Sequence, residues 1–354
     1  MSNDTLRKPP VNAGVAPRAF EWRVPDSPYG ACVAELVSGA SLMERGRIAV
    51  IESLKNWAAE RGYAVAVGRP SVLEHAACDI RRRIDAGEFA SAFREAIVSK
   101  YRFQESDDPR GATAVIIFAI PRPAHVVTFQ TENGELEAIV PPTYVRYTGT
   151  WDEVRAELAP IIPPERLHRL NAPLKAIAAC LGLVKYGRNN ISYAPGMGSY
   201  HQLVGFLTDV DCATEAEAPS TPERLPECER CMVCRKACPT GAVSDDRFLL
   251  RAERCLTWLN EQPDPWPEWV PAGAHNSLVG CMTCQDKCPV NKGKPKAERL
   301  APAFTAEETA TMISGAFSPH DAAWQSARAK LEGMGLVGYE GFIGRNLKAL
   351  LRRA

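Results

Sequence analysis

Cysteine is the residue of this chain whose type and spacing point most directly to chemistry. Four of the twelve cysteines stand in the pattern C-x-x-C-x-x-C-x-x-x-C-P, from Cys228 to Pro239. This spacing is typical of bacterial ferredoxins, in which three of the cysteines bind one [4Fe–4S] cluster and the fourth binds a neighbouring cluster. A structural zinc ion needs only four ligands in all. The motif therefore predicts iron–sulfur clusters, provided that the chain supplies a second set of cysteines.

A shorter motif further along the chain supplies that second set. It has the pattern C-x-x-C-x-x-x-C-P over residues 281–289, which is the first motif without its leading cysteine. Cys255 can provide the missing ligand from a distance. The symmetry of the motifs then predicts two clusters, with one cluster plus a zinc ion as the alternative. The first cluster takes Cys228, Cys231, Cys234 and Cys288, and the second takes Cys238, Cys255, Cys281 and Cys284.

Composition limits the surroundings in which these cysteines act. The 42 acidic and 42 basic residues balance, so the chain has no overall attraction to nucleic acid or to an anionic membrane. It shows no apolar leader and no apolar run near the roughly 18 residues of a membrane span. We therefore expect a cytoplasmic protein without a membrane partner, in which clustered cysteines bind metal more often than they form disulfides.

The elements that must position the cysteines follow from the hydrophobic pattern. Helical spacing covers residues 41–62 and 71–99, and short strands are expected at 63–68 and 201–210. The continuous apolar run 114–120 predicts a buried strand, and the stretch 125–142 predicts a hairpin around an Asn-Gly turn. Thr150 has the capping-box pattern of a helix start. A helix bent at Pro173 is expected over 164–181, and further helices lie in 300–354.

Four regions result from this pattern. The domains are expected to be an extended arm at 1–29, an α+β domain at 30–222, a double-cluster domain at 223–295 and a helical segment at 296–354. The cluster region has too few apolar residues to fold without metal. A ferredoxin needs only about a quarter of this chain, so the preceding domain must have another task. It is either the active-site domain of a reductase or the docking domain of an electron carrier.

The loop between residues 183 and 200 is the most informative part of that preceding domain. Its glycines allow a ligand to approach the backbone closely, and its polar side chains offer hydrogen-bond donors. The alternative is a tight connection whose polar residues face water. The glycines are Gly187, Gly196 and Gly198, and the donors are Arg188, Asn189 and Asn190.

The stretch from Gly182 to Asn189, both cysteine motifs and the ending Gly280-Cys281 to Asn291 together resemble the epoxyqueuosine reductases, which are similar to the reductive dehalogenases. The resemblance covers about residues 45–350. It implies an α+β fold, with a nitroreductase-like cobalamin-binding α/β domain, a bacterial-ferredoxin-like two-cluster domain and a short helical tail. It also implies that the clusters reduce a bound cobalamin, and [4Fe–4S] potentials reach low enough for this.

Two departures from that family bear on the substrate. The aspartate proton donor of an Asp-x-Ala-Pro stretch is missing, because the chain has Leu170 and Asn171 before Ala172-Pro173. The family's Asp-Tyr-His sequence is also replaced, at 151–153. We therefore expect a small-molecule substrate and a low-potential electron donor such as a flavodoxin or ferredoxin. Two alternatives stay open: a tRNA epoxyqueuosine reductase, and an electron-transfer or docking protein without a corrin.

The site residues follow from the loop and from this resemblance. Tyr147 is the first candidate for the proton donor, because a phenol near a cation can act as a general acid, and Arg188 is the second catalytic candidate. Tyr147 has the alternative of a buried aromatic residue with a satisfied hydroxyl group. The expected cobalamin-binding residues are Tyr186, Gly187, Asn189, Asn190, Gly196, Gly198 and His201.

Overall fold

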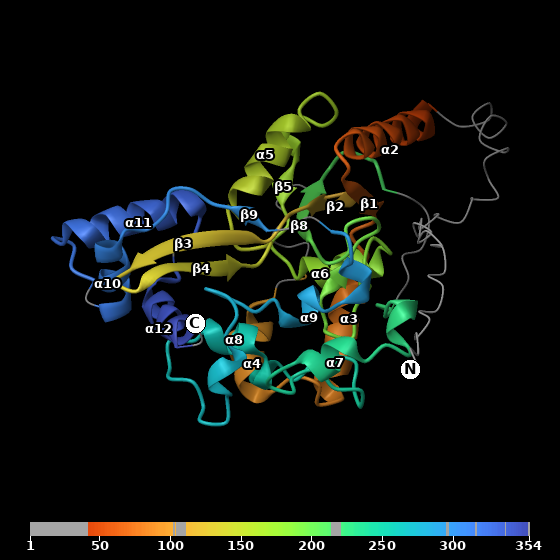
Figure 1. Cartoon of the computed structure of the whole chain (residues 1–354). Helices are drawn as coiled ribbons and strands as arrows, with labels where there is room; N and C mark the ends of the chain where they lie inside the picture. Colours follow the sequence, from red (N-terminus) through yellow and green to blue (C-terminus); the bar gives the residue numbers. More distant parts are fainter. Residues whose placement is uncertain are drawn as a thin grey trace, which may run out of the picture.

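The computed structural model describes residues 42–101, 103, 111–213, 221–294, 297–315, 317–336 and 338–352. The predicted arm at 1–29 lies outside these residues. Figure 1 shows a strongly twisted central sheet with helices on both faces, so the protein mixes helix and sheet as expected. Within the described ranges, no helix combines the length and the apolar character needed to cross a membrane.

The central sheet has four antiparallel strands in the order β1-β2-β8-β5. The predicted apolar strand is confirmed as β2, and it is buried because neighbouring strands cover both its edges and helices cover both its faces. Its partner β8 is aligned so that Phe118 lies opposite Val204. The strands are β1 (Ala64–Gly68), β2 (Ala114–Pro121), β5 (His168–Arg169) and β8 (His201–Thr208).

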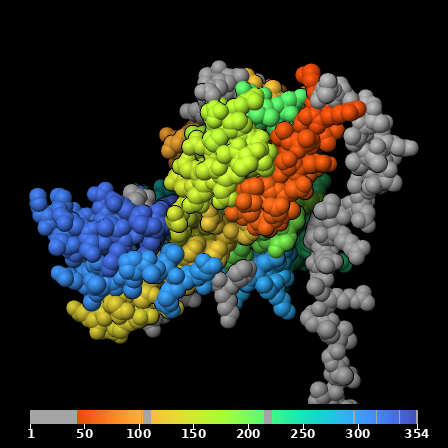
Figure 2. Space-filling view, turned by 90° about the horizontal axis from the view of Figure 1, so that it is seen from above, coloured from red at the N-terminus to blue at the C-terminus, as the bar shows by residue number. Residues whose placement is uncertain are grey.

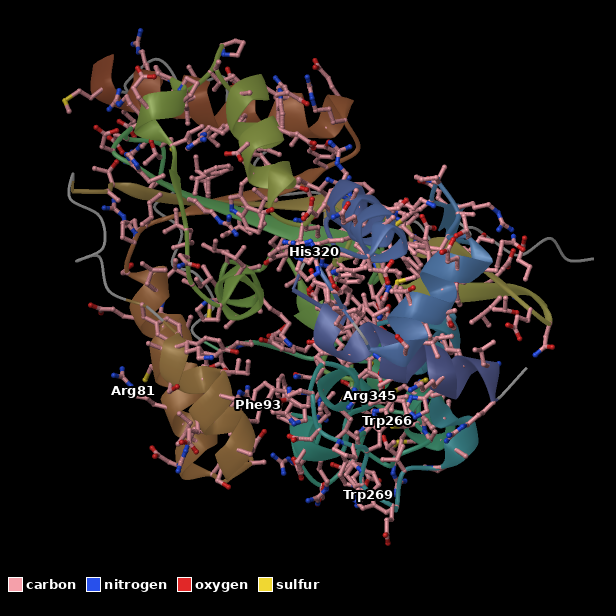
Figure 3. All side chains as sticks on the ribbon, turned by 90° about the vertical axis from the view of Figure 1, so that its left-hand side faces the viewer. Arg81, Phe93, Trp266, Trp269, His320 and Arg345 are labelled. Atoms are coloured by element: carbon pink, nitrogen blue, oxygen red, sulfur yellow. The ribbon has the colours of Figure 1, made fainter. Side chains whose placement is uncertain are left out.

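Helices form a layer on each face of this sheet. Helices α2 (Leu42–Glu60) and α5 (Gly149–Glu157) lie on one face, and α3 (Val72–Asp85) and α6 (Leu174–Cys180) lie on the other (Figures 1 and 3). The predicted helix at the start of the described chain ends at Glu60, and Gly62 just beyond it has a φ of +67°, which suits a residue without a side chain. A further short helix, α4 (Ser91–Ala96), follows α3 in the chain.

The predicted hairpin does not pack on the central sheet. It forms a second hydrophobic core with the C-terminal helices, in which Phe129 stacks on Phe304 with the ring centroids 4.8 Å apart. Figure 2 shows the hairpin and the C-terminal residues together at one end of the molecule. The elements are β3 (His125–Thr131), β4 (Gly134–Val140), β9 (Glu298–Arg299), α10 (Ala306–Ser314), α11 (Ala322–Met334) and α12 (Glu340–Leu351). The second core therefore joins segments that are far apart in the sequence.

The cysteine-rich region contains only short elements, as its low apolar content predicts. It lies below the central sheet in Figure 1 and connects the two cores. A small two-stranded sheet of the preceding loop contacts it, since Tyr186 N–H donates to Glu223 O at 2.9 Å. The elements are α7 (Val233–Ala237), α8 (Leu256–Asn260), α9 (Thr283–Asp286), β6 (Lys185–Tyr186) and β7 (Ser192–Tyr193).

Two local predictions are wrong. Helix α5 begins at Gly149, and Thr150 uses its hydroxyl to bond Arg146 O at 3.3 Å and Gln202 Oε1 at 3.2 Å instead of capping the helix. The single bent helix expected over 164–181 is a 3₁₀ turn, strand β5 and then α6. Pro173 stands immediately before the first helical residue, because proline disfavours helical geometry at the residue that precedes it.

Candidate active site and cysteine cavities

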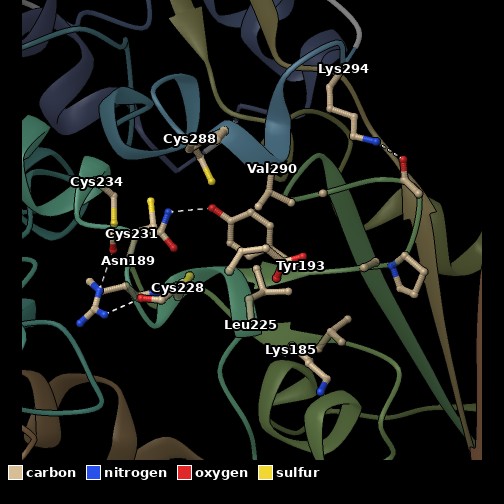
Figure 4. A pocket seen from close by; sticks show the side chains of 18 of the residues that line it. Lys185, Asn189, Tyr193, Leu225, Cys228, Cys231, Cys234, Cys288, Val290 and Lys294 are labelled. Carbon is tan, nitrogen blue, oxygen red and sulfur yellow. Dashed lines mark hydrogen bonds between the residues drawn. The ribbon is translucent and has the colours of Figure 1, made fainter. Parts of the chain in front are cut away.

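Four of the predicted cluster ligands line one cavity of about 960 Å³, called here the first cysteine cavity. They are Cys228, Cys231, Cys234 and Cys288. Figure 4 shows their sulfur atoms around a common space. The first three come from the turn before α7 and from α7 itself, and the fourth follows α9. Helices α7 and α9 pack together, which brings the two motifs into contact.

The other four cysteines line a smaller cavity of about 260 Å³, the second cysteine cavity. They are Cys238, Cys255, Cys281 and Cys284. The first cavity combines three cysteines of the first motif with one of the second, and the second cavity combines two of the second motif with Cys238 of the first and the remote Cys255. Four cysteines are a donor set that fits a [4Fe–4S] cluster. Among the described side chains, no group of three His, Cys, Asp or Glu residues is placed to hold a single metal ion.

Arg188 lies at the first cysteine cavity. Its backbone N–H donates to Cys228 Sγ at 3.4 Å, and its side chain donates to the carbonyl oxygens of Cys228 and Cys231, the latter at 3.1 Å. The residue is 6% exposed, so these bonds are shielded from water. The arrangement makes Arg188 a support for the cysteine loop. It does not line the cavity that the other catalytic candidate, Tyr147, lines.

The loop glycines also serve internal packing. A Cβ atom on Gly187 would overlap Asn189 Oδ1 and the Tyr193 ring, and one on Gly198 would overlap Asn291 Oδ1. Gly196 and Gly198 line the first cysteine cavity, and Asn189 lines both cysteine cavities. At Gly187 and Gly198 the backbone is therefore approached closely by neighbouring side chains, whereas nothing lies within 4 Å of a Cβ atom on Gly196.

A third cavity, of about 540 Å³, has aromatic walls and is called the aromatic cavity. It shares five lining residues with the second cysteine cavity, so the two spaces have a common wall. These residues are Thr143, Tyr144, Lys175, Ser192 and His201. A cluster in the second cysteine cavity would therefore lie beside any molecule held in the aromatic cavity.

Four of the residues predicted for catalysis or cofactor binding line the aromatic cavity. Burial raises the pKa of Tyr186, and partial burial raises the pKa of Tyr147, which is 40% exposed, so both phenols stay protonated at neutral pH. Burial lowers the pKa of His201 to about 4, and its ring bonds Ser192 Oγ at 3.1 Å and Gly198 O at 3.0 Å. A neutral imidazole satisfies both bonds by accepting from Ser192 and donating to Gly198. The fourth residue is Asn190.

Lys175 is a candidate functional residue that sequence reasoning missed. Its ammonium group donates to Asn190 O at 2.8 Å, and burial lowers its pKa to about 8. In the described part of the chain, no acidic side chain forms an ion pair with it within 4.0 Å. The signal available in the sequence was one lysine inside the apolar helix LKAIAAC. Asn190 adds a buried Oδ1 atom without a partner among the described residues.

Comparison with known proteins shows what this chain resembles. Residues 227–291 match the family model described as a 4Fe-4S double cluster binding domain. The epoxyqueuosine reductase of Bacillus subtilis is 34% identical over 120 residues, and that of Listeria monocytogenes is 31% identical over 118. The resemblance to the epoxyqueuosine reductases is confirmed. These matches cover 34% and 33% of this chain and 29% of each relative, so the relatives' activity does not transfer directly.

Solved structures extend the likeness to the fold. An epoxyqueuosine reductase from Streptococcus thermophilus has a TM-score of 0.59 at 15% identity, covering 86% of this chain and 80% of its own. Another, in complex with an epoxyqueuosine-modified tRNA stem loop, has a TM-score of 0.54 at 21% identity, covering 88% and 82%. At such identities the likeness establishes a common fold. The nitroreductase-like detail stays a prediction.

Proposed function

We propose that the chain is an iron–sulfur reductase whose two [4Fe–4S] clusters deliver electrons to a group bound in the aromatic cavity. The single observation that supports this best is the wall of five residues between that cavity and the second cysteine cavity. Because electron transfer needs proximity, the second cluster is the one that serves the cavity. The first cluster then takes electrons from a low-potential donor such as a flavodoxin or ferredoxin.

The clusters would be held as the symmetry of the motifs predicts. The first would be bound by Cys228, Cys231, Cys234 and Cys288, and the second by Cys238, Cys255, Cys281 and Cys284, because each set lines one cavity. Bound clusters supply one-electron transfer at low potential. The chain adds donors to the thiolates: Arg188 N–H to Cys228 at 3.4 Å and Asn276 Nδ2 to Cys281 at 3.2 Å. Such hydrogen bonds tune cluster potentials.

Cobalamin is the proposed electron acceptor that the family resemblance implies. The residues present fit it, because the aromatic cavity offers flat walls, the unpartnered Asn190 Oδ1 and the Lys175 ammonium group, which suit the amide side chains of a corrin. Cobalamin would supply a cobalt centre that accepts electrons at low potential. The volume of about 540 Å³ is that of a cavity for a drug-sized ligand, so it would enclose part of the cofactor.

Epoxyqueuosine in tRNA is the first substrate to test, because the relatives in sequence and in structure are epoxyqueuosine reductases. One observation keeps a small-molecule substrate as the second candidate. Ala172 and Pro173 line the aromatic cavity, whereas Leu170 is packed in the core and Asn171 is exposed. No carboxylate therefore reaches the cavity from this segment. Tyr147 is the proposed proton donor in its place.

Analysis of anaerobically reconstituted protein tests the proposal. We expect about eight iron and eight sulfide per chain, and cobalt near one per chain after incubation with cobalamin and gel filtration. Iron near four would refute the second cluster, and protein without cobalt would favour the corrin-free electron-transfer alternative. Complementation of a strain that lacks epoxyqueuosine reductase then separates the substrates. Restored queuosine would support epoxyqueuosine in tRNA as the substrate. If the protein holds all its cofactors and no queuosine forms, a small-molecule substrate is supported.

A further inference from the structure

We propose that Lys175 is a positioning charge for the second cluster, whose reduced state its ammonium group stabilises. This inference rests on the proposed function, since it requires a cluster in the second cysteine cavity. It gives a role to a residue outside both cysteine motifs. Lys175 is in α6, on the wall common to the second cysteine cavity and the aromatic cavity.

The first step is the charge inventory of the second cysteine cavity. Among the described residues that line it, Lys175 is the single lysine or arginine, and none is aspartate or glutamate. Its hydrogen-bond partner, Asn190 O, is neutral. The protein thus places one positive charge there without a matching acid. The cysteine thiolates and the cluster they hold would be the nearest negative groups.

The charged and titratable groups that face Lys175 from other elements are already paired or neutral. In the aromatic cavity, Asp79 is bonded to Arg83 at 2.8 Å. Tyr144 donates to Glu261, and burial raises the pKa values of both. His201 is neutral because of its low pKa. Among the described residues, Lys175 therefore remains the uncompensated charge of this wall.

The first cysteine cavity has a different electrostatic environment. It is lined by four basic residues and by Glu227, and one of the four, Lys185, forms an ion pair with Glu223 at 2.7 Å with its side chain 32% exposed; the other three are Arg188, Lys292 and Lys294. Water and the carboxylate both weaken the field of such a lysine. Lys175 is partly buried and, among the described residues, forms no ion pair with a carboxylate, so its charge acts on the second cysteine cavity without that compensation.

The proposed step transfers one electron between the clusters and neither forms nor breaks a bond. The first cluster loses an electron, which came from the low-potential donor, and the second cluster gains it; no proton or leaving group moves. Reduction adds one negative charge beside the ammonium group, which stabilises the reduced state and raises the potential of the second cluster. The local charge is one of the features that set the potential of such clusters.

Potentiometric titration of the reconstituted protein, followed by electron paramagnetic resonance, tests this inference with Lys175→Met. At a fixed potential we expect the reduced-to-oxidised ratio of the second cluster to fall at least about tenfold. This corresponds to a decrease of its midpoint potential by about 59 mV for a one-electron couple. The first cluster should keep its midpoint. The second cluster is identified as the signal that Cys255→Ala removes. Lys175→Arg should restore the midpoint, and Lys185→Met is the matched control that should move neither cluster.

Two results would overturn the inference: unchanged midpoints in Lys175→Met, or an equal shift of both clusters. If Lys175→Met loses iron, Lys175→Gln takes its place under the same criteria. Loss of the second cluster in the Met, Gln and Arg variants alike would show that the side chain acts through shape, which also overturns the charge role. Wild-type protein with fewer than two titrating clusters would instead refute the proposed function.

Discussion

At the scale of single residues, the division of eight cysteines between two cavities is the central feature. Cys288 completes the first cavity although it belongs to the second motif, and Cys238 completes the second although it belongs to the first. Neither cavity keeps four cysteines if one motif is lost. The two motifs therefore depend on each other, and the remote Cys255 is the one ligand outside both.

Replacing that remote ligand should separate the two clusters. In Cys255→Ala we expect iron to fall from about eight to about four per chain, because the second cluster loses a ligand and the first keeps all of its own. Iron and sulfide analysis under anaerobic conditions measures this. Cys180→Ala is the matched control, since Cys180 is a fully buried core thiol away from both cavities and should leave iron unchanged. Iron that stays near eight in Cys255→Ala would contradict the ligand assignment.

The buried neutral His201 makes stability depend on pH. Its pKa is about 4 in the folded chain and 6.5 in the unfolded one, so the unfolded chain binds the proton more readily. The contribution is fully present above pH 6.5 and is lost as the pH falls from there toward 4. Between pH 6.5 and 5 we expect the free energy of unfolding to drop by up to about 2 kcal/mol from this residue.

Denaturant unfolding at pH 7 and pH 5 measures that drop. His201→Gln should reduce the difference between the two pH values, because glutamine does not titrate. The exposed His320 provides the control, and His320→Gln should leave the difference as in the wild type. A pH difference that is identical in His201→Gln and in the wild type would rule out His201 as its source.

At the scale of elements, the loop from residue 187 to 193 supports the first cysteine cavity. Its backbone returns on itself through the small β6–β7 sheet, and Gly187 N–H donates to Ile191 O at 2.8 Å. This turn places Arg188 against Cys228 and Cys231. The loop therefore positions a cysteine segment that comes much later in the sequence.

A single methyl group should disturb this element. In Gly187→Ala the new Cβ would overlap Asn189 Oδ1 and the Tyr193 ring, so the loop must move. We expect a destabilisation of about 1–3 kcal/mol, as for overpacked cores, and loss of iron from the first cluster. Thermal unfolding and iron analysis measure both. Gly149→Ala is the control, because nothing lies within 4 Å of a Cβ there; equal stability of the two variants would argue against a packed loop.

At the scale of the whole molecule, the C-terminal helices help to build the second cysteine cavity. Asn346 in α12 is 1% exposed and donates to Leu278 O at 2.9 Å and to Asn260 O at 3.0 Å. Asn260 in turn donates to Gly280 O at 2.8 Å, next to Cys281. Arg345 lies over Trp266 at 4.5 Å in the same region (Figure 3). Helix α12 is therefore part of the cluster support.

Removing that support should affect a cluster whose ligands are distant from α12 in the sequence. In Asn346→Ala two buried carbonyl groups lose a donor, which costs about 1–3 kcal/mol for each group left unsatisfied. We expect a lower melting temperature and iron reduced toward about four per chain, because Cys281 and α8 lose their position. Asn171→Ala, at an exposed asparagine, is the control. Full iron content in Asn346→Ala would show that α12 contributes stability alone.

Much of the fold could be predicted from local patterns because those patterns have local causes. The β2 strand, the β3–β4 hairpin and the C-terminal helices follow from hydrophobic spacing and turn residues. The helix around Pro173 was placed wrongly, because the pairing of β5 with β8 competes with helical propensity. The packing of the hairpin on the C-terminal helices has no local signal, since it joins segments that are far apart in the sequence.

The sequence by itself determined the cluster chemistry, because cysteine spacing controls which thiolates can reach one cluster. It also indicated that the larger preceding domain has a task of its own. Only the tertiary structure showed which candidate residues lie together. It placed Arg188, Gly196 and Gly198 at the first cysteine cavity and Tyr147 and His201 at the aromatic cavity. It also placed Lys175 on the wall between cluster and pocket, which depends on long-range packing that no local pattern records.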